Sequence, residues 1–225
     1  MKSLLSRYLA RARAMQFHYL LASLVLLLAV YPYVSAGPSG PVALKVLSSF
    51  VLITGVYAVS NRRRQVVIAV LLAVPAFGLG WLQVITGNPA LGSAESVFTL
   101  LFYAFTALVG LSRVLGTQRI TTDTIYGAVS VYLLMGLTWA TAYDLVEGIT
   151  PGSFSAGPGE VLTFPAFIYY SFVTLATLGY GDITPITDQA RSLAVLETVS
   201  GTLYIAVLIA RLVAAAGWRT DAGDG

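Results

Sequence analysis

The stretch from Phe164 to Pro185 decides the interpretation of the chain and reads FPAFIYYSFVTLATLGYGDITP. Its apolar first part, residues 164–176, is too short for a helix that crosses the roughly 30 Å hydrocarbon core of a bilayer. Its second part alternates two glycines with residues that carry side chains, and glycine adopts backbone angles that other residues avoid. The stretch therefore predicts a short helix followed by an irregular strip whose successive carbonyl groups can point the same way.

The sequence on both sides of this stretch is that of an integral membrane protein. Of 225 residues, 57% are hydrophobic and only 10% are charged, and the mean hydropathy is +0.80. A soluble domain carries about 25% charged residues. Six apolar runs are long enough to cross a bilayer: roughly 16–34, 42–60, 65–86, 95–115, 123–145 and 188–215.

The fold class that we expect is an all-α membrane protein with six transmembrane helices, in which a re-entrant pore helix and a selectivity filter lie between the fifth and the sixth. Irregular backbone at membrane depth is tolerated only where it is buried in protein or lines a water-filled path. The expected division is an N-terminal cytoplasmic or interfacial segment (1–15), a four-helix domain (16–115), a pore domain (116–215) and a short cytoplasmic tail (216–225). Within the pore domain we expect an outer helix (123–145), a pore helix (164–176), a filter (177–181) and an inner helix (188–215).

The basic residues predict the orientation. With a cytoplasmic N-terminus, eleven of the 13 Lys and Arg residues lie inside, and only Lys45 and Arg191 lie outside. This distribution obeys the positive-inside rule, places both termini in the cytoplasm and is expected of a plasma (inner) membrane protein. One alternative stays open, in which the first run is a signal peptide cleaved near Ala36. The remaining topology is the same in both cases.

Several classes of function are disfavoured by what the sequence lacks. There is no cysteine and one histidine, His18, which leaves no thiol nucleophile and no cysteine-based zinc site. No nucleophile–base constellation or metal-ligand cluster is visible, so we expect no enzymatic activity, no cofactor and no nucleic-acid partner. His18 is more simply a packed residue at the membrane edge than a pH sensor.

The glycine strip has a specific physical use. Four copies of it around an axis form rings of carbonyl oxygens that replace the hydration shell of a dehydrated cation. The Thr177 hydroxyl adds one more ring at the inner end. Because the chain contains one strip and a ring needs four, we expect a homotetramer with fourfold symmetry.

These residues resemble the filter of the potassium channel family, Thr-x-Gly-Tyr-Gly, and the resemblance extends over about residues 123–215. It implies that K⁺, as the permeant ion, is coordinated by the carbonyls of Thr177, Leu178, Gly179 and Tyr180, and that Gly181 shapes the outer mouth. It also implies filter support from residues matching the family's acidic and aromatic positions: Asp182, Tyr169 and Tyr170.

Two residues of the last apolar run carry hypotheses of their own. The resemblance makes Gly201 a gating hinge, although close helix packing explains a small residue equally well. Glu197 lies deep in the same run, where a charge is costly. We expect it behind the filter near Ser171 or Thr174, as support that couples the inner helix to the filter, or else as a hydrogen-bonding strut. The face expected to line the cavity comprises Thr202, Ile205, Ile209 and Val213.

The first four runs do not resemble a voltage sensor, which needs several arginines along one span. The fourth run has only Arg113, at its inner end, so weak or absent voltage gating is expected. The short linker after Arg113 favours packing of these helices on their own subunit. Residues 62–64 are three arginines that anchor the topology or bind anionic lipid. The alternatives to a potassium channel subunit are a non-conducting scaffold or regulatory subunit, and a channel-like K⁺ transporter component.

Overall fold

The computed structural model describes residues 15–34, 40–117, 120–157 and 162–221, with side chains as far as Arg211. The expected N-terminal segment 1–14, the alternative cleavage site near Ala36, the end of the tail and the Val213 side chain lie outside the described residues. The elements are α2 (Gln16–Val34), α3 (Gly40–Ala58), α4 (Arg63–Thr86), α5 (Pro89–Gly116), α6 (Thr122–Ile149), β1 (Phe154–Ser155), α7 (Phe164–Leu175), β2 (Thr184–Pro185) and α8 (Asp188–Asp221).

Six of these helices, all except α7, are long and apolar enough to cross a membrane. The prediction of an all-α protein with six membrane-spanning helices is thereby confirmed. Helix α8 continues to Asp221, beyond the expected end at residue 215. Helix α5 begins at Pro89 and not near residue 95, because the Asn88 side chain accepts a hydrogen bond from the Ala90 N–H and proline suits the first helical turn.

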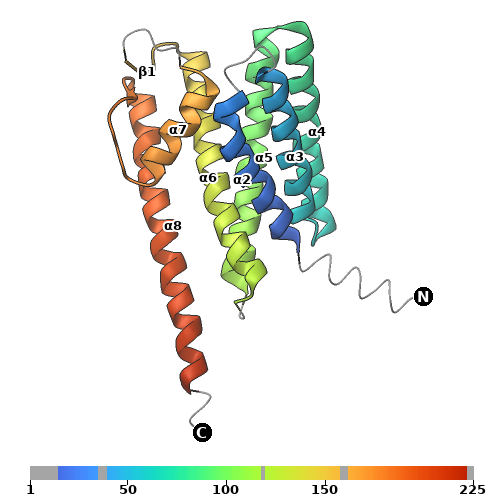
Figure 1. Cartoon of the computed structure of the whole chain (residues 1–225), viewed down its shortest axis with the longest axis vertical. Coiled ribbons are helices and arrows are strands. Elements are labelled where there is room, and N and C mark those ends of the chain that lie inside the picture. Colours follow the sequence, from blue (N-terminus) through green and yellow to red (C-terminus); the bar gives the residue numbers. More distant parts are fainter. Residues whose placement is uncertain (1–14, 35–39, 118–119, 158–161, 222–225) are drawn as a thin grey trace, which may run out of the picture.

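Helix α6 lies at the centre of the arrangement. It packs against α2 and α5 on one side and against α7 and α8 on the other, while α3 and α4 complete the four-helix group. Figure 1 shows α2–α5 together on one side of α6 and α8 on the other, with α8 extending well beyond the remaining helices. The four-helix group and the segment that follows it are therefore connected through one shared helix.

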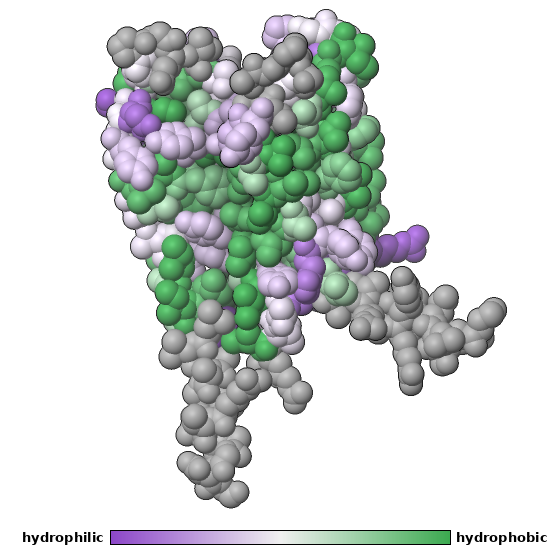
Figure 2. Space-filling model, viewed as in Figure 1, coloured by the Kyte–Doolittle hydropathy of each residue, from purple (hydrophilic) through white to green (hydrophobic). Residues whose placement is uncertain are grey.

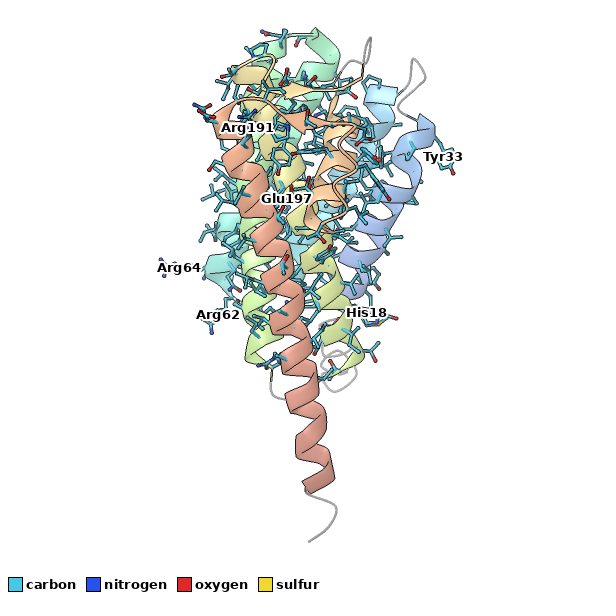
Figure 3. The ribbon with its side chains drawn as sticks, turned by 90° about the vertical axis from the view of Figure 1, so that its left-hand side faces the viewer. His18, Tyr33, Arg62, Arg64, Arg191 and Glu197 are labelled. Carbon is cyan, nitrogen blue, oxygen red and sulfur yellow. The ribbon has the colours of Figure 1, made fainter. Side chains whose placement is uncertain are left out.

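The surface is apolar over most of its height. Figure 2 shows a broad hydrophobic region on the visible face. Many large apolar side chains point outward, among them Phe50, Ile53, Leu71 and Leu108. A soluble monomer rarely exposes so large a continuous apolar area. In Figure 3, Arg62, Arg64 and His18 lie toward one end of the molecule and Arg191 and Tyr33 toward the other.

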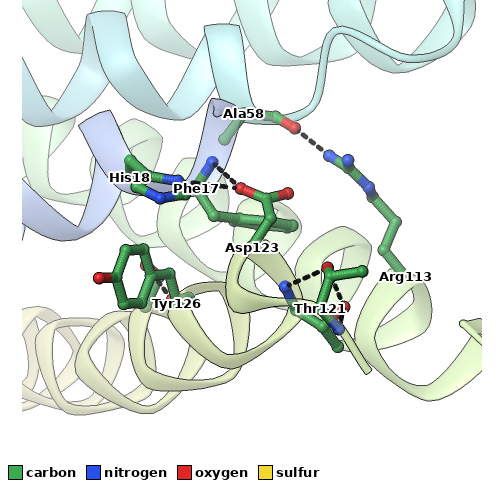
Figure 4. A network of polar contacts seen from close by, with 9 residues as sticks. Phe17, His18, Ala58, Arg113, Thr121, Asp123 and Tyr126 are labelled. Carbon is green, nitrogen blue, oxygen red and sulfur yellow. Dashed lines mark hydrogen bonds and ion pairs between the residues drawn. The ribbon is translucent and has the colours of Figure 1, made fainter. Parts of the chain in front are cut away.

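A polar network at the His18 end joins helices that are far apart in sequence (Figure 4). The Asp123 carboxylate, in the first turn of α6, accepts the backbone N–H of Phe17 and lies 3.3 Å from His18 Nδ1. The Arg113 guanidinium donates to the Ala58 carbonyl at 2.5 Å and lies over the Phe17 ring. Asp123 thus caps the first turn of α2 from a different helix, and α2, α3, α5 and α6 are held together at this end.

Candidate functional site

The end of α7 determines the conformation of the strip that follows it. Thr177 N–H donates to the Thr174 carbonyl, and Leu178 N–H donates to the Val173 carbonyl at 2.8 Å. These two bonds form a Schellman motif, in which one residue takes the left-handed conformation that glycine usually supplies. Here that residue is Thr177, with φ of 60°. The C-terminal cap of α7 therefore leads directly into the first residue of the strip.

Positive φ angles recur at every second residue of the strip. Gly179 has φ of 59° and Gly181 has φ of 80°, whereas Leu178 and Tyr180 between them do not lie in this region. Only glycine adopts such angles without steric cost, which explains its spacing here. The side chains between are uncovered by their own chain, with Leu178 57% and Tyr180 67% exposed.

Two short strands, one before α7 and one after the strip, bring the two ends of this segment together. β1 precedes α7, β2 follows the strip, and the two strands pair in antiparallel fashion, with Phe154 opposite Pro185. The N–H groups of Ile186 and Thr187 both donate to the Ser153 carbonyl. The chain therefore leaves this point at β1 and returns to it at β2, with α7 and the strip in between.

Glu147 holds the start of this segment, a role that sequence reasoning missed. Its carboxylate accepts the N–H of Gly152 at 2.8 Å and the N–H of Phe154 at 3.0 Å. An acidic residue at the end of a helix, followed by a glycine-containing turn, is the local signal that points to such a cap. The cap fixes the turn that leads from α6 into β1.

Asp182 and Tyr169 are directly connected. The Tyr169 hydroxyl donates to Asp182 Oδ2 at 2.7 Å, and Asp182 Oδ1 accepts the N–H of Ile183. The hydrogen bond from Tyr169 lowers the pKa of the Asp182 carboxyl below its ordinary value. The strip's outer end is thus tied to α7, thirteen residues earlier in the chain.

Tyr170 has different neighbours from Tyr169, and its role as filter support stays a prediction. Its ring packs edge-on against Tyr143 of α6 and Phe154 of β1 and is buried. Consecutive helical residues point about 100° apart, so only one of the pair faces Asp182. Tyr170 instead joins α7 to the residues behind it.

Glu197 of α8 is fully buried, and its hydrogen-bond partners lie on α6 and α7. Figure 3 shows it in the part of α8 beside the other helices. Its carboxyl accepts hydrogen bonds from Ser171 Oγ, at 2.5 Å, and from the Tyr143 hydroxyl. Ser171 Oγ also lies 2.7 Å from the Gly136 carbonyl oxygen. The contact with Ser171 agrees with the position expected from sequence, whereas Tyr143 was not foreseen. One carboxyl therefore connects the three helices.

Gly201 lies where α8 approaches the end of α7 most closely. A Cβ atom at this position would be 2.6 Å from the Leu175 carbonyl oxygen and 2.8 Å from Leu175 Cδ1. This geometry favours the packing explanation for the glycine; its role as a hinge stays a prediction. Thr202, Ile205 and Ile209 are exposed on α8, so their own chain does not cover the face expected to line a cavity.

Comparison with known proteins agrees with this geometry. A family model described as an ion channel matches residues 128–216, which include α7, the strip and most of α8. Protein LctB of Bacillus caldotenax is 31% identical over 128 residues, which cover 55% of this chain and 86% of that protein. No solved structure matches the chain significantly.

Two further relatives have potassium channel names. The inward rectifier potassium channel Kirbac3.1 of Paramagnetospirillum magnetotacticum is 37% identical over 41% of this chain and 29% of that protein. The voltage-gated potassium channel Kch of Escherichia coli (strain K12) is 27% identical over 49% of this chain and 23% of that protein. The chain thus spans less than a third of the length of these two channels. An apolar six-helix protein with this strip, this match and these relatives is an integral membrane protein of the potassium channel family.

Proposed function

We propose that the chain is the subunit of a potassium-selective channel that conducts K⁺ passively along the axis of a homotetramer. The observation that carries the proposal is the alternation of positive φ at Thr177, Gly179 and Gly181. In this proposal the carbonyls of residues 177–180 form rings that replace the hydration shell of K⁺. The potassium channel names of several relatives support the choice of ion.

The exposed side chains of the strip support the tetramer. Leu178 and Tyr180 are large, apolar or aromatic, and more than half exposed in one chain. On α8, Val199 and Leu203 are also exposed. One strip cannot surround an ion, whereas four copies around an axis form closed rings and cover these side chains.

The residues behind the strip are its proposed support. Asp182 and Tyr169 hold its outer end, and Glu197 connects α7 to α6 and α8. The proposed cavity below the strip is lined by the exposed face of α8, with Thr202, Ile205 and Ile209 on it. These groups position the strip and the inner helix and take no part in a chemical reaction.

The orientation and the role of the four-helix group follow from charge and packing. With both termini in the cytoplasm, Arg62, Arg63 and Arg64 face the inner leaflet, where anionic lipid headgroups attract them. Helices α2 and α5 pack on α6 of the same chain, which supports an arrangement without exchange between subunits. Arg113 donates to a backbone carbonyl at the end of α3, so the proposal includes no voltage sensor.

A flux assay tests the proposal. The purified chain, verified as a tetramer, is reconstituted into liposomes with a K⁺ gradient, and uptake of K⁺ and Na⁺ is compared with and without Ba²⁺. We expect K⁺ uptake that excludes Na⁺ and is blocked by Ba²⁺. Gly179→Ala is the matched variant, because alanine disfavours φ of 59° and should abolish selective uptake. Equal uptake of Na⁺ would show a non-selective pore and contradict K⁺ selectivity. No uptake from the verified tetramer under any voltage or pH would favour a scaffold.

A further inference from the structure

A cavity of about 850 Å³ is lined by residues of α2, α3, α4, α5, α6 and the start of α7, and by no residue of the strip. Gly87 and Pro89, where α4 ends and α5 begins, belong to its lining. This volume is within the range of small-molecule binding sites, about 300–1,000 Å³. Much of its wall is apolar: Leu27, Leu44, Leu52, Leu145 and Ile168.

The charges in this cavity do not balance. The charged groups among the described lining residues are Lys45, Glu95 and Asp144. The Lys45 ammonium forms an ion pair with the Glu95 carboxylate. Asp144 has one long hydrogen bond, from Ser96 Oγ at 3.4 Å, although a carboxylate can accept about four. The Lys45 charge also acts on Asp144, but one ammonium group serves two partly buried carboxylates. The cavity therefore favours one additional positive charge.

A hydroxyl group in the same cavity lacks a partner. Tyr103 lines the cavity, is only 2% exposed, and its hydroxyl forms no hydrogen bond with any described residue. Buried tyrosine hydroxyls usually have a partner. Glu95, Thr99 and Tyr103 are spaced four residues apart on α5, so they form one polar stripe that faces the cavity.

We infer that this cavity binds a small organic ammonium compound. Its cationic group donates hydrogen bonds to the Asp144 carboxylate and to the Tyr103 hydroxyl oxygen, and its hydrocarbon part covers the leucine walls. An inorganic cation would balance the charge but leave the apolar walls uncovered. A neutral apolar compound would cover the walls but leave Asp144 without a partner.

Helix α7 connects the cavity to the strip. Thr163, Phe164 and Pro165, at the start of α7, form part of its wall, and the other end of α7 leads into Thr177. Asp144 belongs to α6, which packs along α7. Binding of the ammonium compound is independent of the proposed channel function; only an effect of that binding on K⁺ flux rests on it.

Equilibrium dialysis of the full chain in nanodiscs of zwitterionic lipid tests the inference, with radiolabelled phenethylammonium as the probe and empty nanodiscs as the blank. We expect saturable binding at one site per chain. Asp144→Asn should weaken it at least tenfold, and Tyr103→Phe, which removes only the hydroxyl, should weaken it about threefold. Asp188→Asn, which removes an exposed carboxylate at the start of α8 outside the cavity, should leave the affinity unchanged.

Three outcomes would overturn the inference: no saturable binding above the blank, equal affinity for the neutral phenethyl alcohol, or unchanged affinity in both cavity variants. The first would mean that water alone fills the cavity, and the second that it is merely apolar. Size-exclusion profiles show whether each variant is folded. If Asp144→Asn does not fold, the binding affinity of Tyr103→Phe decides whether the inference holds. If the wild-type protein conducts no K⁺ even without the probe, the proposed function is contradicted. The result of the binding experiment is unaffected by that outcome.

Discussion

Gly201 of α8 and the Leu175 carbonyl of α7 approach so closely that a methyl group at position 201 would lie 2.6 Å from the oxygen. A backbone atom cannot move aside as a flexible side chain can. Helix α8 and the end of α7 therefore approach this closely only with glycine at residue 201, and a larger residue forces them apart.

Gly201→Ala should consequently destabilise the protein. Overpacking of this kind costs about 1–3 kcal/mol. The thermal midpoint of unfolding in detergent measures the effect. Gly78→Ala on α4 is the matched control, because no atom lies within 4 Å of a Cβ there, and it should be neutral or slightly stabilising. A Gly201→Ala protein as stable as wild type, but with altered opening, would favour the hinge.

Glu197 should tolerate glutamine better than alanine. An amide can donate to Ser171 Oγ and accept from Tyr143, which keeps both contacts. Alanine leaves the buried Tyr143 hydroxyl without its partner, at a cost of roughly 1–3 kcal/mol, whereas Ser171 Oγ keeps the Gly136 carbonyl. The ratio of K⁺ to Na⁺ flux should fall for Glu197→Ala and remain near wild type for Glu197→Gln.

The exposed Ser192 on the same helix provides the control for this comparison, because Ser192→Ala removes a hydroxyl with no buried contact. Wild-type selectivity and stability in both Glu197 variants would show that the cluster does not support the strip.

The link between Tyr169 and Asp182 should depend on pH. Because the hydrogen bond lowers the pKa of Asp182, it contributes above the ordinary aspartate pKa of about 3.9 and is lost as the pH falls through the lowered value. Tyr169→Phe removes the bond, so the Asp182 pKa should rise in this variant. Carboxyl carbon NMR titration of Asp182 measures the shift, and equal titration curves in the two proteins would contradict the link.

The K⁺ selectivity of flux should also respond to pH differently in wild type and in Tyr169→Phe. As the external pH is lowered, Tyr169→Phe should lose K⁺ selectivity at a higher pH than wild type. Tyr19→Phe is a suitable control, since Tyr19 lies on α2 and its ring packs against Tyr57 of α3. If both proteins lose K⁺ selectivity at the same pH, a titrating group other than Asp182 determines that pH.

Membrane voltage should have little effect on opening. The guanidinium of Arg113 is held by the Ala58 carbonyl and the Phe17 ring, and no other arginine lies along α5. Voltage sensors carry about 3–4 mobile charges per subunit. In planar bilayers we expect an open probability that is nearly constant between about −100 and +100 mV, and a steep change equivalent to several charges per subunit would overturn the expectation.

The six spans were predictable because twenty consecutive apolar residues have few alternatives in a membrane protein. The strip was predictable because its glycines coincide with the positions that require positive φ. Thr177 is the exception: it takes φ of 60° without being glycine, and only the cap of α7 explains why. Local sequence specifies these features almost completely.

Contacts between distant residues were not predictable to the same degree. Tyr143 reaches Glu197 across 54 positions, and no pattern in a single sequence pairs them. The direction of Tyr170 depends on which face of α7 meets α6, and the cavity beside Asp144 depends on the packing of six elements. Such features arise from tertiary packing, which periodicity alone does not encode.

The pairing of β1 with β2 has a practical consequence for protein engineering. Because Phe154 lies opposite Pro185 and Ser153 holds Ile186 and Thr187, the two ends of the enclosed segment are fixed next to each other. Residues 154–185 therefore form a cassette whose ends would keep their spacing whatever lies between them. Chimaeras that join two relatives at these paired ends should retain the geometry of the graft, whereas junctions placed inside α7 would separate the short helix from its cap.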